Sequence, residues 1–489
     1  MQNLLFVSAF TVAQALCSTV IALFIGIFAA FFTANRDFPG KKILLSFSTV
    51  PLCMPSLLIA LGFVSFFGMA GTLNTILKSL FNLEKPPVTF LYTFLGIIIA
   101  QGFYNFPLVM ASIHDTWKNI PTQQAEAARL LGASEIRIFR TVTIFQLMPA
   151  IVSSCMLVFL YCFFSFLIVL LFGGVGCTTL EVEIYKTVRG SLDFSKAAGF
   201  AITETVLACI FVGFYAFLEQ KSSKNRGIAF YQKQADRKIS GISERIFAFF
   251  TFSLILLFFI APLFSIFYNA VSSSKSILTF STILRVFKTS GFFQSFLTTI
   301  SVALATSFLC VIPAFSYAAF LRTFDSAGRL LFLRIIPMIP LCISSVVTGV
   351  LIIILVKSGT VVHLIAAQVF LTWPLAFRQI YACVSKIPDE TIDAARILSH
   401  RKRDLIFRIY IPQSSRGILS ALGFCFAVSA GDTTLPLVLA LPRFSNLSLF
   451  TYRLASSYRF HEACAAGLIL GAICMIVFAF ANKMKTNHR

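Results

Sequence analysis

Long, almost uncharged apolar segments alternate with short polar segments along the whole chain. A bilayer core about 30 Å thick requires roughly 20 apolar residues per helix. The segments that meet this requirement are 5–32, 44–69, 88–112, 148–173, 195–219, 246–270, 292–321, 330–357, 362–384, 416–440 and 465–483. Backbone polar groups in lipid must be satisfied within a segment, and the apolar residues do not alternate as they do in barrel strands. The pattern therefore predicts about eleven transmembrane helices.

The composition agrees with an all-α polytopic membrane protein. Hydrophobic residues make up 58% of the chain and charged residues 12%, whereas soluble domains carry about 25% charged residues. A soluble enzyme is therefore excluded. The net charge of +21 predicts no nucleic-acid partner, because most Lys and Arg residues lie in the short segments between apolar segments.

The positions of the basic residues predict the orientation. Most of them fall on one side if segments 33–43, 113–147, 220–245, 322–334, 378–416 and 483–489 face the cytoplasm. The C-terminus is then cytoplasmic and the N-terminus lies outside. The polar, basic segment 220–245 becomes a cytoplasmic linker between a first transmembrane half, 1–219, and a second half, 246–489.

An internal repeat is the most informative feature of the sequence. Residues 101–151 align without gaps with residues 368–418. Gln101 and Pro107 match Gln368 and Pro374, and an acidic-Ala-Ala-Arg string follows in each copy. These strings are Glu126, Ala127, Ala128 and Arg129 in the first copy and Asp393, Ala394, Ala395 and Arg396 in the second. Six predicted spans separate the copies, so both face the same side and the repeats are parallel and tandem.

Each string lies in a cytoplasmic loop, 113–147 or 385–415, that we call a coupling loop. In the first loop Pro121 favours the start of a short helix, and Gly132 permits the left-handed turn that ends it. A second helix is expected from Ser134 into the next span. A short helix joined rigidly to two membrane helices can transmit a push from a partner. An ordinary amphipathic loop helix is the simpler alternative, but it does not explain two matched copies.

These residues carry a family resemblance. The string EAARLLGASEIRIF, preceded by Ile120 and Pro121, resembles the EAA loop of ABC-importer permeases, which docks on a separate ATP-hydrolysing subunit. The resemblance implies a fold like that of type I importers in a bacterial inner membrane. It also implies ATPase-coupling residues in both loops: Glu126, Ala127, Ala128, Arg129, Gly132, Asp393, Ala394, Ala395, Arg396 and Ser399. The second copy departs from the family pattern at Asp393 and Ser399.

The resemblance also implies partners. They are two copies of a cytoplasmic ABC ATPase, an extracytoplasmic solute-binding protein and membrane lipid, without nucleic acid or cofactor. The outer segments 174–194, 271–291 and 441–464 would form the platform for the solute-binding protein. The chain itself lacks the GxxxxGK[ST] phosphate loop, so we expect ATP hydrolysis by the partner and no enzyme activity of its own.

Two outer segments indicate which permeases within the family the chain resembles. Residues 177–198 and 448–470 are similar to the fused, double-length permease of thiamine importers, and ferric-iron permeases are next. Thiamine is the expected substrate. Within the class of ABC importers, ferric iron or another small ion is the alternative substrate. A secondary transporter driven by an ion gradient is the alternative from another class. The first half has five predicted spans where the family usually has six. Either a peripheral helix has been lost or the true start lies upstream, and we expect an in-frame basic and apolar segment upstream of Met1.

Ionisable residues within predicted spans are candidates for a substrate path. Glu204 and Asp432 are the clearest, and Tyr104 and Trp373 offer aromatic faces for a cationic solute such as thiamine. The alternatives are that Glu204 lies near the outer rim and that Asp432 pairs with a backbone group. The five histidines are scattered without ligand spacing, so no metal site is expected.

Overall fold

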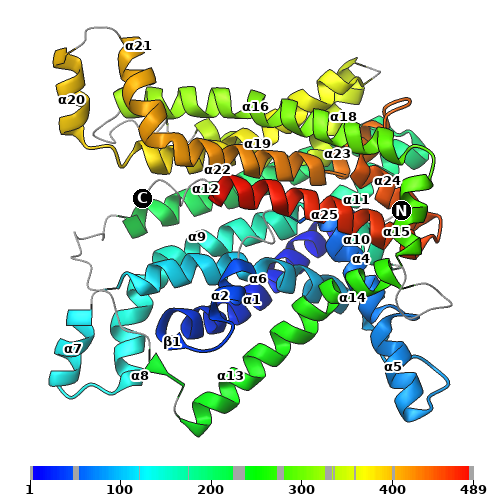
Figure 1. The fold of residues 1–489 in the computed structure, drawn as a ribbon, viewed down its shortest axis with the longest axis horizontal. Coiled ribbons are helices and arrows are strands. Elements are labelled where there is room, and N and C mark those ends of the chain that lie inside the picture. Colours follow the sequence, from blue (N-terminus) through cyan, green and yellow to red (C-terminus); the bar gives the residue numbers. More distant parts are fainter. Residues whose placement is uncertain are drawn as a thin grey trace. The chain divides into compact units, whose positions relative to one another are not determined.

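A computed structural model describes residues 4–47, 54–120, 122–174, 176–223, 237–239, 241–272, 280–324, 333, 336–356, 359–398 and 402–483. Contacts divide the chain into two compact units. The first unit holds 1–51, 59–183 and 196–266, and the second holds 52–58, 184–195 and 267–489. The predicted division into halves 1–219 and 246–489 stays a prediction. Figure 1 shows that the units consist almost entirely of helices.

In the first unit, α1 (Leu4–Asn35) packs along α6 (Phe94–Lys118) and α9 (Ile144–Phe163). Two glycines permit the close approach of α1 and α6. A Cβ on Gly26 would lie 2.6 Å from the Val109 Cβ, and one on Gly102 would lie 2.6 Å from the Ile21 Cγ2. Small residues at such positions let membrane helices maximise dispersion contacts.

Further elements complete the first unit. They are α2 (Lys41–Ser46), α4 (Ser56–Phe67), α5 (Thr72–Phe81), η2 (Phe90–Tyr92), α10 (Leu167–Phe172), α11 (Leu180–Lys186), α12 (Phe194–Ser223), α13 (Ile242–Ile255), η5 (Leu256–Ile260) and α14 (Ala261–Val271), some of which continue into the second unit. Strand β1 (Arg36–Asp37) pairs in parallel with β2 (Arg237–Lys238). The strand pair ties residues near the end of the linker to the end of α1.

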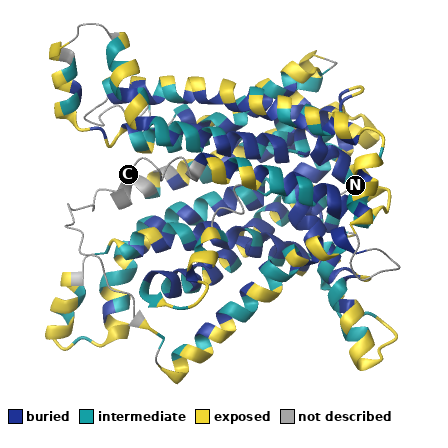
Figure 2. Cartoon of the chain, viewed as in Figure 1, coloured by how far each residue is buried: buried dark blue, intermediate teal, exposed yellow. Residues whose placement is uncertain are grey.

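In the second unit, α16 (Phe292–Phe324), α19 (Val361–Val384) and α22 (Ile411–Gly431) pack against one another. Around them lie α15 (Ser281–Lys288), α18 (Ser345–Val356), α23 (Thr434–Leu439), α24 (Leu447–Ser456) and α25 (Phe460–Lys483). Its apolar core includes Val302, Leu364, Ala367, Leu435, Leu439, Leu441 and Phe444. In Figure 2 these helices carry both buried and exposed residues along their lengths, as expected for helices that bury small residues against each other and turn large apolar residues to lipid.

The tandem repeat is visible in individual hydrogen bonds. Helices α6, α9, α10 and α11 correspond to α19, α22, α23 and α24. The Thr11 hydroxyl accepts a hydrogen bond from the Leu180 backbone N–H at 3.0 Å. In the second unit, the Thr299 hydroxyl accepts one from the Leu447 N–H at 2.7 Å. The same device therefore fixes the start of the outer helix α11 and of its equivalent α24.

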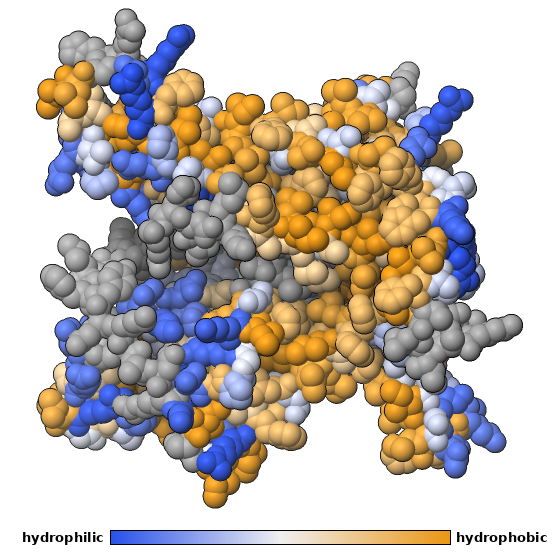
Figure 3. Space-filling view, viewed as in Figure 1, coloured by the Kyte–Doolittle hydropathy of each residue, from blue (hydrophilic) through white to orange (hydrophobic). Residues whose placement is uncertain are grey.

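Ten helical segments in the described part of the chain are long and apolar enough to cross a membrane. This confirms the all-α polytopic prediction, and Figure 3 shows hydrophobic side chains over much of the face in view. The predicted span 330–357 differs, because α18 has only 12 residues and follows the 3₁₀-helix η6 (Ile336–Cys342). Pro337 and Pro340 lack the N–H that an α-helix needs. At about 1.5 Å per α-helical and 2.0 Å per 3₁₀ residue, the two pieces together still measure about 32 Å.

Three other predicted spans are interrupted. Segment 148–173 is divided between α9 and α10, and segment 416–440 between α22 and α23, at equivalent positions of the repeat. Segment 44–69 contains α2 and α4, and residues 48–53 within it lie outside the described residues. Hydropathy averaged over a span does not reveal these breaks, since each interrupted segment is apolar as a whole.

Candidate functional site

The first coupling loop contains α7 (Thr122–Leu130) and α8 (Glu135–Ile138). Gly132 has a φ of 81°, and the backbone N–H of Ala133 donates to the Ala128 carbonyl at 3.0 Å. This is the Schellman arrangement that ends a helix at a left-handed glycine. The predicted turn at Gly132 is confirmed, and α8 begins directly after Ser134 as expected.

The second coupling loop contains α20 (Asp389–Leu398) and α21 (Lys402–Leu405). The position equivalent to Gly132 is Ser399, which lies outside the described residues, and only the backbone of Arg396 is described. Each loop continues into a π-helical turn at the equivalent place, η3 (Phe139–Thr143) and η7 (Ile406–Tyr410). Such turns widen a helix locally and are frequent at functional sites.

The coupling residues are exposed in the same pattern in both loops. Glu126 and Ala127 are exposed and Ala128 is half-buried, and Asp393, Ala394 and Ala395 follow the same order. Figure 2 shows the exposed ends of α7 and α20. A helix that presents alanine to solvent lets the backbone of another protein approach closely, so the arrangement fits a docking surface.

Each coupling helix also ends in two exposed apolar side chains that the sequence analysis missed. Leu130 and Leu131 are 90% and 88% exposed, and their equivalents Ile397 and Leu398 are 79% and 87% exposed. A lone exposed Leu is ordinary, but matched exposed apolar pairs indicate a surface that a partner covers. The signal in the sequence was an apolar pair at the same place after both acidic-Ala-Ala-Arg strings.

Arg129 is held by an exposed ion pair within its own loop. Its Nε and Nη2 donate to the two Glu135 carboxylate oxygens at 2.6 and 3.0 Å. This hydrogen bonding to Glu135 raises the pKa of Arg129, so the side chain stays charged. The residue equivalent to Glu135 is Lys402, which cannot accept such a bond. The two coupling loops therefore expose similar helix surfaces, but only the first loop has this ion pair.

The two loops are anchored at their bases by different chemistry. In the first unit the Trp117 ring, at the end of α6, lies 5.7 Å from the Phe31 ring and stacks on Phe139 at 5.9 Å. In the second unit Nη2 of the buried Arg322 donates to the Ile387 carbonyl at 2.7 Å and to the Asp389 carboxylate at 2.6 Å. Either anchor ties the loop to a spanning helix, so a force on the short helix is transmitted to the bundle.

Asp432 caps a helix break. Its Oδ1 accepts hydrogen bonds from the N–H groups of Thr434 and Leu435 at 3.0 and 3.3 Å, and its Oδ2 accepts one from Gln368 Nε2 at 3.0 Å. The alternative that Asp432 pairs with backbone groups therefore has direct support. Trp373 lies five residues after Gln368, about 140° away around α19, and packs edge-on against Tyr317 at 5.9 Å.

Glu204 is fully buried on α12 and meets the carboxyl group of Glu181, at the start of α11. Glu181 was not among the sequence candidates, because it lies in an outer segment rather than in a span. Tyr104 is half-buried on α6. The structure brings Glu204 together with an acid, and a substrate contact by Glu204, Asp432, Tyr104 or Trp373 stays a prediction.

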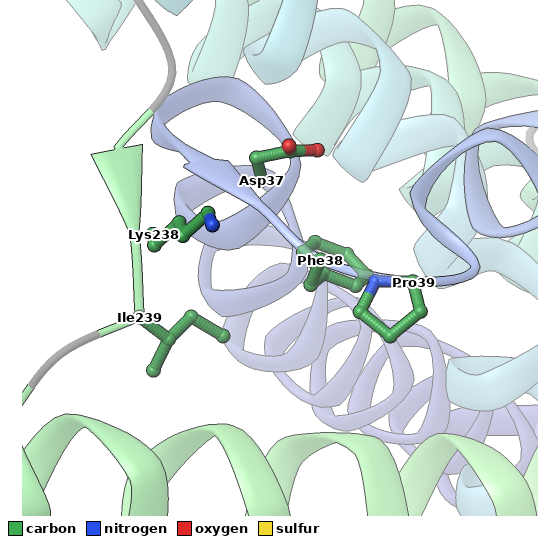
Figure 4. A pocket seen from close by; sticks show the side chains of 5 residues that line it. All are labelled: Asp37, Phe38, Pro39, Lys238 and Ile239. Carbon is green, nitrogen blue, oxygen red and sulfur yellow. The ribbon is translucent and has the colours of Figure 1, made fainter.

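A hollow of about 490 Å³ lies beside the strand pair in the first unit. Its lining residues are Asp37, Phe38, Pro39, Lys238 and Ile239. Figure 4 shows that they come from β1 and the turn after it on one side and from β2 on the other. One carboxylate and one ammonium beside apolar side chains select no ligand class, so the coupling loops remain the functional surface with the clearest chemistry.

Comparison with known proteins finds relatives among transport system permeases. The thiamine transport system permease protein ThiP of Escherichia coli is 26% identical over 97% of this chain and 88% of its own length. A putative 2-aminoethylphosphonate transport system permease protein, PhnU of Salmonella typhi, is 33% identical over 40% of this chain and 68% of its own length. A solved chain of a bacterial ABC transporter involved in alginate import covers 50% of this chain and 96% of its own length, with 16% identity and a TM-score of 0.42.

A family match covers most of the chain. The inner membrane component of binding-protein-dependent transport systems matches twice, over residues 22–224 and residues 316–483. The first match contains the first coupling loop and the second match contains the second coupling loop. The chain therefore belongs to the family of inner membrane components of binding-protein-dependent transport systems, as a double-length permease that carries the family module twice.

Proposed function

We propose that this permease carries thiamine into the cytoplasm, driven by two separate ATPase subunits that dock on α7 and α20. The main support for the proposal is that these two helices match each other. Ala127 and Ala394 present the same small exposed surface, beside the same exposed apolar pair, on otherwise different loops. A chain without a phosphate loop of its own would need these two docking surfaces.

The path of the coupling motion follows from the continuity of the helices. Helix α8, the turn η3 and α9 form one unbroken segment, Glu135–Phe163. In the second unit α21, η7 and α22 likewise follow one another without a gap, from Lys402 to Gly431. A partner that moves α7 or α20 would therefore move a whole spanning helix. ATP binding would close the two ATPases and switch the bundle from inward to outward facing, and hydrolysis would reset it.

The proposed orientation places both coupling loops, the linker 220–245 and the C-terminus in the cytoplasm of a bacterial cell. A solute-binding protein would deliver the substrate to the outer segments 174–194, 271–291 and 441–464. The name of the family supports such a partner. In the second of these segments, α15 exposes Leu284 and Phe287, which fits contact with membrane lipid or a docked protein.

Thiamine is favoured as substrate by the thiamine permeases, which align with 97% of this chain. One observation favours a second candidate. The 2-aminoethylphosphonate permease is more similar to this chain, at 33% identity, but over a shorter region. Ferric iron remains the third candidate within the class.

Uptake of labelled thiamine tests the substrate. Cells that lack their own thiamine uptake would express the chain with the ATPase and binding protein encoded beside it. We expect uptake that unlabelled thiamine abolishes and that 2-aminoethylphosphonate or ferric citrate leaves unchanged. Uptake of either of those two compounds, with no uptake of thiamine, would make that compound the proposed substrate.

ATPase binding tests the docking surface separately. Burial of a Leu side chain contributes about 1.5–3 kcal/mol, so Leu131→Ser together with Leu398→Ser should weaken ATPase binding by at least about tenfold. Leu80→Ser is the matched control, because Leu80 is 71% exposed on α5, outside both coupling loops. Unchanged ATPase affinity in the double variant would refute docking at these two helix ends.

A further inference from the structure

Two acidic side chains in the first unit are buried far from the coupling helices in sequence. Glu181, at the start of α11, and Glu204, within α12, are both 0% exposed. The two carboxyl groups lie close enough together to act on each other electrostatically. Neither Glu204 oxygen receives a hydrogen bond from an N–H or a hydroxyl group within the described part of the chain. Glu204 therefore depends on Glu181 for its polar contact.

Two carboxyl groups that are buried and lie this close together need a proton on at least one of them. Two ionised carboxylates in contact repel each other strongly, and burial removes the water that would screen them. The charge that acts on Glu204 is that of Glu181, so a proton rather than a cationic side chain makes the burial of Glu204 tolerable. The pair therefore holds at least one proton.

The surrounding helices contribute little charge. Helix α12 packs on α9 through Phe211 and Phe159, whose ring centroids are 4.4 Å apart, and α11 is fixed to α1 through Thr11. Within their helical ranges α1 and α9 carry no charged side chain, and their titratable groups are the thiols of Cys17, Cys155 and Cys162 and the hydroxyl of Tyr161.

The charged and titratable groups on α11 and α12 themselves are few. On α11, Glu183 accepts a hydrogen bond from the Thr178 hydroxyl at 2.9 Å, and Tyr185 and Lys186 follow it. On α12, the Lys196 ammonium lies over the Phe200 ring, 5.8 Å from its centroid. The other groups are Cys209, Tyr215, Glu219 and Lys221. Glu204 therefore meets a carboxyl group in a largely apolar part of the unit.

The second copy of the repeat shows that the fold does not need these acids. When the starts of α11 and α24 and the starts of α12 and α25 are aligned, the positions equivalent to Glu181 and Glu204 are Ser448 and Leu470, which are 0% and 1% exposed. The Ser448 hydroxyl donates to the Asp432 carbonyl at 2.8 Å, so an uncharged residue suffices there. Helices of the same kind therefore pack in the second copy without a buried acid, and the pair is an addition of the first copy.

We propose that Glu181 and Glu204 form a proton-binding site, which joins the outer helix α11 to the spanning helix α12 while the shared proton is bound. Separation of the two helices admits water to both carboxyl groups, and the proton leaves. This site lies beyond the proposed thiamine transport and does not depend on it. Its ligand is a proton, and neither carboxyl group needs to touch the substrate.

Labelling of the purified full-length permease with the hydrophobic reagent dicyclohexylcarbodiimide tests the site. The reagent reacts with a protonated carboxyl group in an apolar environment. The carboxyl proton moves to a carbodiimide nitrogen, the carboxyl oxygen bonds to the central carbon, and the adduct rearranges to an N-acylurea without a leaving group. We expect an adduct on Glu204 or Glu181 at about pH 6, at least about tenfold more than at about pH 10, where carboxyl groups are normally ionised.

Variants and cations distinguish the outcomes. The double variant Glu181→Ser and Glu204→Leu carries the residues of the second copy, so it should fold and lose the adduct. Absence of an adduct on both residues of the folded wild-type chain at about pH 6 overturns the proposal. Protection by millimolar Na⁺ or Mg²⁺ at constant pH also overturns it, because the ligand would then be a metal cation. Thiamine uptake is not measured in this experiment, so its outcome is independent of the transport proposal.

Discussion

The two copies of the repeat differ most around a matched glutamine. In the second copy, Gln368 Oε1 accepts hydrogen bonds from Thr306 at 3.0 Å and Ser429 at 2.7 Å, and its Nε2 donates to Asp432. In the first copy, Gln101 Oε1 accepts one from Ser18 at 2.9 Å. The Gln101 Nε2 has no hydrogen-bond partner among the residues that the structure describes. The same backbone thus carries a saturated polar network in one copy and an incomplete one in the other.

The sequence explains the difference. The residues equivalent to Ser429 and Asp432 are Cys162 and Ser165, so the first copy lacks the carboxylate that would accept from Gln101. Gln14 Oε1 and Asn105 Oδ1 are also buried there without a partner in the described structure. A buried polar atom without a partner costs about 1–3 kcal/mol. We therefore expect the first copy to be the less stable part of the bundle and the second copy to be the more rigid part.

The largest effect is expected at the coupling helices, where both copies expose an alanine at the same position. Ala127→Trp together with Ala394→Trp should reduce uptake to background, because bulk on both coupling helices prevents close approach of the ATPases. Folding should be unaffected, since both side chains are exposed. Each single variant should lose at least about tenfold, equivalent to about 1.4 kcal/mol. Glu84→Trp, at an exposed position outside the coupling loops, is the control, and full uptake by the double variant would exclude docking at these alanines.

A reciprocal exchange tests the difference around Asp432. Asp432→Ser removes the cap of α23 and the acceptor of Gln368, and should lower the free energy of unfolding by about 2–4 kcal/mol. Ser165→Asp offers Gln101 the missing acceptor and should raise the free energy of unfolding or leave it unchanged. Denaturant titration of the purified chain measures both. Equal losses from the two exchanges would show that the copies do not differ in this way.

Substitution of the glutamines themselves gives a smaller contrast. Gln368→Leu leaves Thr306, Ser429 and Asp432 without their partner, whereas Gln101→Leu deprives only the Ser18 hydroxyl and removes an unsatisfied amide. The second-copy variant should be less stable than the first-copy variant by about 1–2 kcal/mol. Thermal unfolding in the same detergent provides the comparison, and a larger loss from Gln101→Leu would contradict it.

The smallest effect is expected at the ion pair between Arg129 and Glu135, which only the first coupling loop has. Glu135→Gln removes the ion pair with Arg129, whose two side chains are 73% and 39% exposed. Exposed pairs contribute little, so stability should change by about 0.5 kcal/mol or less. Lys402→Glu would place an acid at the equivalent position of the second loop, and its effect on stability should be equally small. A loss of several kcal/mol of unfolding free energy in either variant would mean that the charge at this position is important for the stability of the chain.

The sequence was sufficient for features that depend on local pattern. Apolar length predicted the spans, and the turn at Gly132 followed from the need for a left-handed residue after α7. The repeat predicted two equivalent coupling helices, because equal local sequences form equal local structure. The matched apolar ends, Leu131 and Leu398, were visible in the sequence but were not recognised, since apolar residues in a membrane protein are normally taken to face lipid or core.

Features that depend on distant partners could not be predicted. Nothing near Glu181 in the sequence indicates that it meets Glu204, and Thr11 gives no local sign that it accepts a hydrogen bond from Leu180. The π-helical turns η3 and η7 arise where one extra residue is accommodated within a turn, which leaves no hydropathy signal. The break at Asp432 is a cap within an apolar segment, so the pattern predicted a continuous span.

Native mass spectrometry of the complex purified through this chain is the most direct test of the central claim, that two matched helices each receive a separate ATPase. The account predicts two ATP-hydrolysing subunits per permease chain in the wild type. In Ala394→Trp, the second coupling helix should no longer hold its ATPase, so this stoichiometry should fall. A wild-type complex without any nucleotide-hydrolysing subunit, or an Ala127→Trp, Ala394→Trp chain that still holds two, would contradict the account.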